Sequence, residues 1–153
     1  EVALGLVGYH YQDKTGLVSA ALIRLGEQDV AMLAPHPGMT PEAALRASLR
    51  HIAAPEFLTT EYVSLRLQLW ALAAADTEFA RINAAAQQRY RDGLATLIRA
   101  ARPSLTAKEC ARRAADIDVI QNGLWLTALL GLDPESVRRS VRQCERIALA
   151  GVE

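Results

Sequence analysis

Apolar side chains recur at three- and four-residue intervals along most of this chain, the spacing that places them on one face of an α-helix. The pattern is clear from Phe57 through Leu65 to Trp70, from Phe79 to Ile98 and from Val137 to Ala148. Hydrophobic residues make up 51% of the sequence and aromatic residues only 5%, because Ala and Leu, both strong helix formers, dominate. The sequence therefore predicts an all-α fold in a chain long enough to bury its own core.

Capping residues mark where the predicted helices begin and end. We expect helices to begin after five N-cap residues: Asp13, Thr40, Asp76, Thr106 and Asp133. Thr106 and Glu109 have the spacing of a capping box, in which each side chain accepts a hydrogen bond from a backbone N–H of the first turn. The Pro-rich segment 35–38 and Pro103 end helices, and Gly131 can close the next one. Ahead of Asp13 we expect a separate short helix from residue 2 to residue 11.

The two last predicted helices point to a homodimer. Residues 111–130 are apolar nearly all round, so this helix must be covered on more than one side. The final helix, from residue 134, carries a narrow apolar stripe flanked by arginines. Two such antiparallel helices form half of a four-helix bundle, and we expect a second copy to complete it. The predicted interface residues are Ile120, Leu124, Leu129, Val137, Val141, Cys144 and Ile147.

Charge and cysteine content exclude several classes of function. Seventeen basic residues balance seventeen acidic ones, so any contact with DNA must be local. Arg138, Arg139, Arg142 and Arg146 favour a solvated outer face of the bundle over a second nucleic-acid surface. Cys110 and Cys144 lie in helical patterns without metal-ligand spacing, which predicts reduced thiols in a cytoplasmic protein. The sequence contains neither an apolar run of transmembrane length nor a secretion signal, so we expect no membrane partner.

The pattern of reactive side chains argues against an enzyme. The three histidines are scattered, so we assign no metal and no cofactor. Asp116 and Asp118, with Glu109, point to different sides of a helix and favour solvated or capping roles over acid–base catalysis. No Ser, Thr or Cys lies in a nucleophile motif.

Large and partly polar side chains on the central helices are candidates for a ligand pocket, because pockets in helical bundles are mostly apolar with a few placed polar groups. The candidates are Phe57, Tyr62, Arg66, Trp70, Tyr90, Asn122 and Trp125. Their rings suit an apolar or cationic ligand. Core packing is the alternative for each of them singly. Asn122 stands apart, because an amide among apolar neighbours needs a partner if it is buried.

The N-terminal residues carry a family resemblance. Val2-Ala3-Leu4-Gly5-Leu6-Val7-Gly8-Tyr9-His10-Tyr11, followed by Lys14 and Leu17, resembles the end of the TetR-family helix-turn-helix. The Leu69-Trp70 segment, the helix with Arg81 and Arg89, and Asn122-Gly123-Leu124-Trp125-Leu126 resemble the regulatory half of the betaine-pathway, choline-responsive repressors. The first two helices of the DNA-binding module are absent from this sequence, and the natural protein is expected to start earlier.

The resemblance implies a ligand-responsive repressor that binds palindromic operator DNA as a dimer and is released by a small-molecule effector. Residues 1–34 would be the end of the DNA-binding module and its connecting helix, and residues 35–153 the ligand-sensing and dimerisation domain. The residues implied in DNA contact are Ala3, Leu4, Gly5, Gly8, Tyr9, His10 and Lys14. The branch slightly favours quaternary ammonium effectors. The alternatives are a structural or scaffold helical dimer without a ligand and, less favoured, a helical-bundle enzyme.

Overall fold

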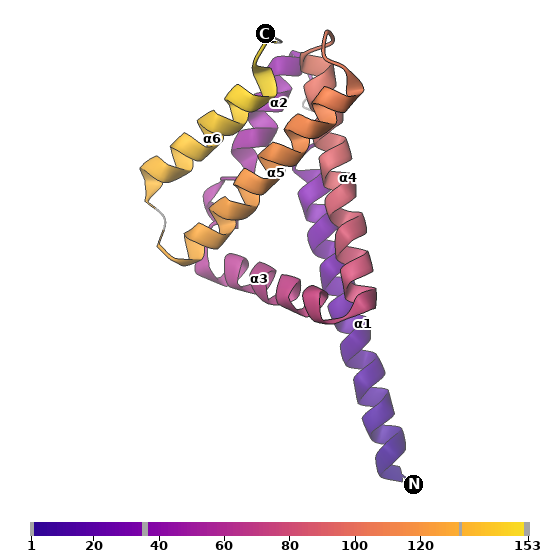
Figure 1. The fold of residues 1–153 in the computed structure, drawn as a ribbon. Helices are drawn as coiled ribbons and strands as arrows, with labels where there is room; N and C mark the ends of the chain where they lie inside the picture. The colour runs from indigo at the N-terminus through magenta and orange to yellow at the C-terminus, as the bar shows by residue number, and fades with distance from the viewer. Residues whose placement is uncertain (1, 35–36, 132, 152–153) are drawn as a thin grey trace.

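The computed structural model describes the backbone of residues 2–34, 37–131 and 133–151, and within these ranges the side chains from residue 14 onward. The described residues form six α-helices and one 3-10 turn, with no strand among them, which confirms the all-α prediction. The elements are α1 (Val2–Ala31), α2 (Pro41–His51), η1 (Pro55–Phe57), α3 (Thr60–Ala75), α4 (Thr77–Ala101), α5 (Ala107–Leu129) and α6 (Pro134–Leu149) (Figure 1).

Four of the five predicted N-caps are confirmed, because each side-chain oxygen accepts a hydrogen bond from a backbone N–H of the first helical turn. The caps are Thr40 on α2, Asp76 on α4, Thr106 on α5 and Asp133 on α6. Thr59 caps α3 in the same way and was not predicted. Gly131 follows the end of α5 with a φ of 92°, a left-handed conformation that favours glycine.

The capping box at the start of α5 forms only in part. Thr106 accepts the N–H of Glu109 at 3.2 Å, but the Glu109 carboxylate accepts hydrogen bonds from Arg112 and Arg113 at 2.7–2.9 Å. These bonds lower the pKa of Glu109 to about 2. The buried Arg113 also donates to the carbonyl oxygen of Ala150 at 2.7 Å. Glu109 thus supports an arginine that ties the start of α5 to the end of α6.

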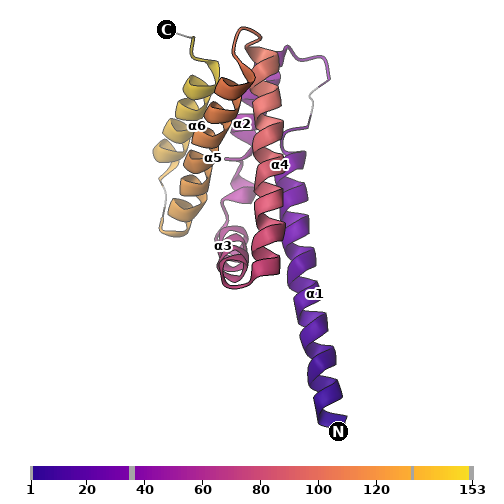
Figure 2. The ribbon, with the colours of Figure 1, turned by 45° about the vertical axis from the view of Figure 1, so that its right-hand side comes forward.

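The predicted break at Asp13 is wrong, because α1 is one continuous helix of 30 residues. No proline lies between residues 2 and 34, and Gly or Asp within a helix costs at most about 1 kcal/mol each relative to Ala. The sequence therefore contains nothing strong enough to stop the helix. In Figures 1 and 2 the first half of α1 extends well beyond the other helices, while its second half lies along α4.

Helix α4 is the centre of the fold and packs against all the other α-helices. Seen in Figure 1, α3, α4 and α5 outline a triangle, with α2 and α6 beside α5. The larger core cluster lies between α2, α4, α5 and α6 and includes Leu45, Leu94, Ile98 and Ile117. A second, smaller cluster joins α1 to α3 and the start of α4. The second half of α1 is therefore part of the folded body.

The predicted apolar stripe of α3 is correct at Leu69 and wrong at Leu65. Leu65, placed on the apolar stripe, is 55% exposed, and Leu72 one heptad later is also exposed. The buried residues of α3 are Val63, Arg66, Leu69 and Ala73. The buried face of α3 packs against α1, α4 and α5, and it includes Arg66.

Gly26 lies at a close approach of α1 to α4. A Cβ placed on Gly26 would lie 2.5 Å from the Cβ of Ala86, an atom fixed to the backbone of α4. We expect Gly26→Ala to lower the free energy of unfolding by about 1–3 kcal/mol through overpacking, although Ala is the better helix former. Urea denaturation measures this change.

Gly16→Ala is the matched control on the same helix. A Cβ at Gly16 meets no described atom within 4 Å, so we expect this variant to be as stable as the parent or up to about 1 kcal/mol more stable. Equal effects of the two substitutions would contradict the tight contact between α1 and α4.

Candidate functional site

A buried arginine lies where α1, α3, α4 and α5 meet. Arg66 of α3 donates to both carboxylate oxygens of Asp29 on α1, with N–O distances of 2.9 and 2.5 Å. One of these nitrogens also donates to the hydroxyl oxygen of Tyr62 at 2.7 Å. The Arg66 side chain is only 1% exposed. A two-pronged, charge-assisted pair of this kind fixes the relative positions of the two helices.

Three aromatic rings surround the Arg66 guanidinium. Its central carbon lies 3.7 Å from the ring centroid of Trp125 on α5, and 5.3 and 5.6 Å from those of Tyr62 and Trp70 on α3. The two indole rings are tilted, with centroids 6.2 Å apart. These distances are in the range of cation–π attraction. The ring faces that would suit a cationic ligand are therefore already in contact with a cation of the protein itself.

Further charged and polar groups surround the arginine. Burial lowers the pKa of Arg66, but its hydrogen bonds to Asp29 and the charge of that carboxylate outweigh burial and raise the pKa, so the guanidinium is charged. On α5, burial raises the pKa of Asp118, although Arg91, 3.5 Å away, opposes this shift. Burial, followed by the charge of Asp118, raises the pKa of Tyr90 well above its ordinary value. Tyr90 is thus a neutral phenol.

Next to Arg66 lies a small cavity with walls from four helices. Its volume is about 20 Å³, close to the room that one water molecule needs. The lining residues are Leu22, Leu25, Gly26, Asp29, Arg66, Trp70, Asn83, Ala86, Gln87, Tyr90, Asp118, Asn122 and Trp125. The cavity therefore has aromatic walls together with several side chains that can donate or accept hydrogen bonds. A larger molecule can enter only if the helices separate.

Two buried N–H groups of the cavity-lining residues lack acceptors among the described residues. They are the Nε of Arg66 and the indole Nε1 of Trp125. The Nε2 of Gln121, whose Oε1 accepts the Tyr90 hydroxyl at 2.7 Å, is a third such donor nearby. A buried donor without an acceptor costs about 1–3 kcal/mol. The closed arrangement is therefore short of hydrogen-bond acceptors.

The structure brings most of the predicted pocket residues together. Five of the seven line the cavity: Arg66, Trp70, Tyr90, Asn122 and Trp125. Tyr62 does not line the cavity, but its hydroxyl accepts a hydrogen bond from Arg66. Asn122 is half-buried, and its side-chain amide donates to a carboxylate oxygen of Asp118 at 3.5 Å.

Phe57 does not line the cavity. It packs edge-on against His51 and Tyr62, with centroid distances of 5.5 and 5.4 Å. Phe57 therefore contributes to core packing and not to the cavity.

Sequence reasoning missed the acidic members of the site. Asp118 was interpreted as solvated or capping, but it is buried and shares a helix face with Asn122 and Trp125, four and seven residues later. Asp29 likewise follows Leu22 and Leu25 at helical spacing on α1. This spacing was the available signal in both cases.

One face of α5 is left uncovered by the described residues. Val119, Leu126 and Leu130 are 70, 50 and 79% exposed, and Leu129 is exposed as well. Gly123, on the same side, would meet no described atom within 4 Å if it carried a Cβ. These residues form an apolar stripe on the side of α5 that faces away from the core. A helix with apolar residues on more than one side leaves such a stripe exposed in a single chain.

Two of the predicted interface residues belong to the interior of the single chain. Leu124 is buried, and Cys144 lies in the larger core cluster, where burial raises its pKa to about 12. Ile120, Val137, Val141 and Ile147 are half-buried. The four arginines predicted as solvated are exposed on α6. Of the seven predicted interface residues, Leu129 is the one that is exposed in the single chain.

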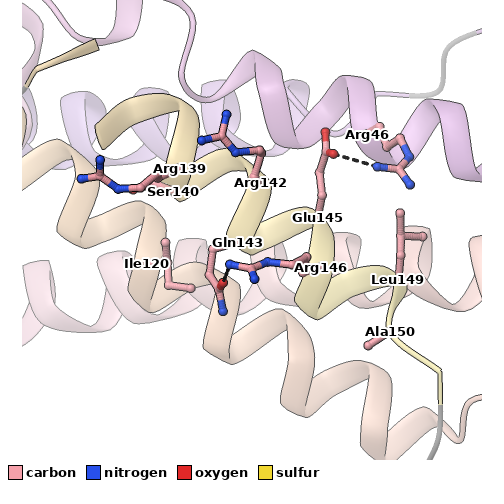
Figure 3. Close-up of a pocket in the computed structure, with 10 residues that line it drawn as sticks. All are labelled: Arg46, Ile120, Arg139, Ser140, Arg142, Gln143, Glu145, Arg146, Leu149 and Ala150. Atoms are coloured by element: carbon pink, nitrogen blue, oxygen red, sulfur yellow. Dashed lines mark hydrogen bonds and ion pairs between the residues drawn. The ribbon is translucent and has the colours of Figure 1, made fainter. Parts of the chain in front are cut away.

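An open groove of about 1,100 Å³ runs along α6 (Figure 3). Ile120 of α5 and Ser140, Gln143 and Leu149 of α6 contribute to its lining. Arg146 donates to Gln143, three residues earlier on α6, and an Arg46–Glu145 ion pair of 2.7 Å joins α2 to α6. The groove is a surface feature whose lining combines apolar residues with four arginines.

Of the residues implied in DNA contact, only Lys14 lies among the described side chains, and it is exposed on α1. The side chains of Ala3, Leu4, Gly5, Gly8, Tyr9 and His10 lie outside the described residues, although their backbone is helical. Across the described residues, no three His, Cys, Asp or Glu side chains are grouped to hold a metal ion. Within the same part of the chain, none of the helices has the length and apolar character needed to cross a membrane.

Comparison with known proteins gives one family match. Residues 37–150, well over half of the chain, match the family described as the C-terminal domain of BetI-type transcriptional repressors. Searches of curated proteins and of solved structures give no significant match. The matched range covers α2 to α6 and includes Arg66, both tryptophans and the apolar stripe of α5. The chain therefore belongs to the BetI-type family of transcriptional repressors, within the TetR family.

Proposed function

We propose that this chain is the regulatory and dimerising part of a repressor whose operator binding is controlled by a small molecule. In this proposal residues 1–34 carry the end of the DNA-binding module, and residues 35–153 sense the effector and dimerise. The observation that carries the proposal is the position of α1. The helix that would present Tyr9, His10 and Lys14 to DNA is also one wall of the buried cavity, through Asp29.

The uncovered stripe of α5 supports dimerisation in this proposal. Val119, Leu126 and Leu130 form an apolar face on one of the two last helices, and a second copy related by a two-fold axis would bury it. A dimer would place two recognition helices in successive major grooves, about 34–36 Å apart. An effector that prefers one arrangement of α1 would change this spacing through its differential affinity for the two states.

The size of the cavity favours a second candidate, a scaffold dimer that takes no ligand. A cavity of about 20 Å³ holds no organic molecule without rearrangement. In this alternative the polar groups around Arg66 only hold α1 against α3, and no effector changes the affinity for DNA.

Selection of binding sites from random DNA tests the proposal. This chain, joined to a complete helix-turn-helix module, is expected to sediment as a dimer and to enrich a palindrome with half-sites one helical turn apart. The chain without the added module is the control for DNA binding through any other surface. A monomer, or the absence of any enriched palindrome, would contradict the proposed function.

A further inference from the structure

The groups that remain unpaired around the buried cavity are hydrogen-bond donors. The Nε of Arg66 and the indole N–H of Trp125 have no acceptor among the described residues, and both side chains are at least nine-tenths buried and line the cavity. The acceptors that do serve Arg66 are the carboxylate of Asp29 and the hydroxyl of Tyr62. A molecule that enters here gains most if it brings oxygen acceptors.

The two partners of the buried ion pair differ in how easily each can leave. The Asp29 side chain is 18% exposed, whereas the Arg66 side chain is 1% exposed. A small movement of α1 returns the carboxylate to water, but the guanidinium would remain inside without a partner. Leaving the buried guanidinium without a partner costs far more free energy than returning the partly exposed carboxylate to water. Asp29 is therefore the exchangeable partner.

The aromatic faces argue against a cation as the occupant. The guanidinium of Arg66 already lies 3.7 Å from the ring of Trp125, so a quaternary ammonium would have to expel Arg66 to reach it. An anion that replaces Asp29 leaves Arg66 in place and leaves the net charge of the cavity unchanged. Asp118, the other carboxylate, keeps its partner Arg91 at 3.5 Å.

We propose that this cavity binds a small molecule with a carboxylate group, which replaces Asp29 on Arg66 and accepts a hydrogen bond from the indole of Trp125. The space left by the Asp29 carboxylate supplies room that the closed cavity lacks. Because Asp29 belongs to α1, the exchange also breaks the ion pair that joins α1 to α3. This last, regulatory step rests on the proposed function, whereas binding of the carboxylate does not.

Tryptophan fluorescence reports on this cavity directly, because both tryptophans of the chain, Trp70 and Trp125, line it. The probes are sodium acetate, butyrate and benzoate, compared with the corresponding amides, sodium chloride and tetramethylammonium chloride. We expect a saturable change with at least one carboxylate and none with its amide or with chloride. A saturable change with tetramethylammonium alone, or with no probe at all, would overturn the proposal.

Asp29→Asn tests the exchange. Without the competing charge, the affinity for the carboxylate is expected to rise about 10-fold or more, because a charge-assisted pair no longer has to be broken. Glu27→Gln removes an exposed carboxylate from the same helix and should leave the affinity unchanged. Equal affinities in the parent and Asp29→Asn proteins would contradict the exchange.

Asp29→Ala allows a second measurement, of thermal stability, in which acetate is the probe and the natural ligand need not be known. Acetate is expected to raise the thermal midpoint of Asp29→Ala more than that of the parent chain, because it fills the vacated position on Arg66. Acetamide and chloride should not do so. An equal effect of acetate on both proteins would overturn the assignment of Arg66 as the anion-binding residue.

The same titrations separate this inference from the proposed function. Release of selected DNA by tetramethylammonium but not by carboxylates would leave a ligand-controlled repressor and overturn the regulatory step of this inference. A protein that binds carboxylates in the fluorescence assay but never binds DNA would keep the site and contradict the repressor.

Discussion

Asp29→Ala is expected to lower the free energy of unfolding by about 3–5 kcal/mol, the usual cost of removing one partner from a buried ion pair. The reason is that Arg66, 1% exposed, keeps its charge but loses both hydrogen bonds to the carboxylate. Tyr62 and the ring of Trp125 remain as partners and hold the effect to this range. Urea denaturation followed by far-ultraviolet circular dichroism measures the change.

Two further variants show whether the unpaired charge is the cause. The double substitution Asp29→Leu with Arg66→Met removes both charges and is expected to recover most of the lost stability, as apolar replacements of buried ion pairs often do. Glu27→Ala, an exposed acid two residues away, should change stability by no more than about 0.5 kcal/mol. A loss below about 1 kcal/mol for Asp29→Ala would contradict the account of a buried, tightly coupled pair.

Leu126→Glu is expected to weaken self-association by about 100-fold or more. In a two-fold interface each substitution occurs twice, so two carboxylates would face an apolar surface and each other. The desolvation of each charge costs several kcal/mol, and every 1.4 kcal/mol corresponds to a factor of about ten in the dissociation constant. Sedimentation equilibrium over a range of concentrations measures this change.

Leu65→Glu is the matched control for the dimer experiment. Leu65 is 55% exposed on α3 and Leu126 is 50% exposed on α5, so both charges should leave the fold of the single chain intact. Only the substitution on the proposed interface should change the molecular mass. If the two variants associated equally well, the interface would not lie on the α5 stripe.

The helices and their boundaries could be read from the sequence because the signals are local. Thr40, Asp76, Thr106 and Asp133 act within one turn of their own helix, and no distant contact is needed to satisfy them. The predicted break at Asp13 failed for the same reason. Asp can cap a helix, but without a proline or a packing conflict nothing forces the helix to stop there.

Helix faces could be predicted less well, because apolar residues lie on more than one side of α5. Leu124 and Val119 are equally hydrophobic, yet one is buried and the other 70% exposed, and only packing against α4 and α6 decides between them. The ion pair between Asp29 and Arg66 spans 37 positions in the sequence. No periodicity within one helix predicts such a pair, although the aromatic residues around it stood out by their size.

The unbroken course of α1 has a mechanical consequence. At 1.5 Å per residue, the stretch from Asp29 back to the helix start is about 40 Å long. It contains no break in the helix that could act as a hinge. A tilt of about 5° at the buried end would therefore displace the far end by roughly 3–4 Å. Under the proposed function, a small rearrangement around Asp29 would therefore move the DNA-facing end of α1 by several ångströms.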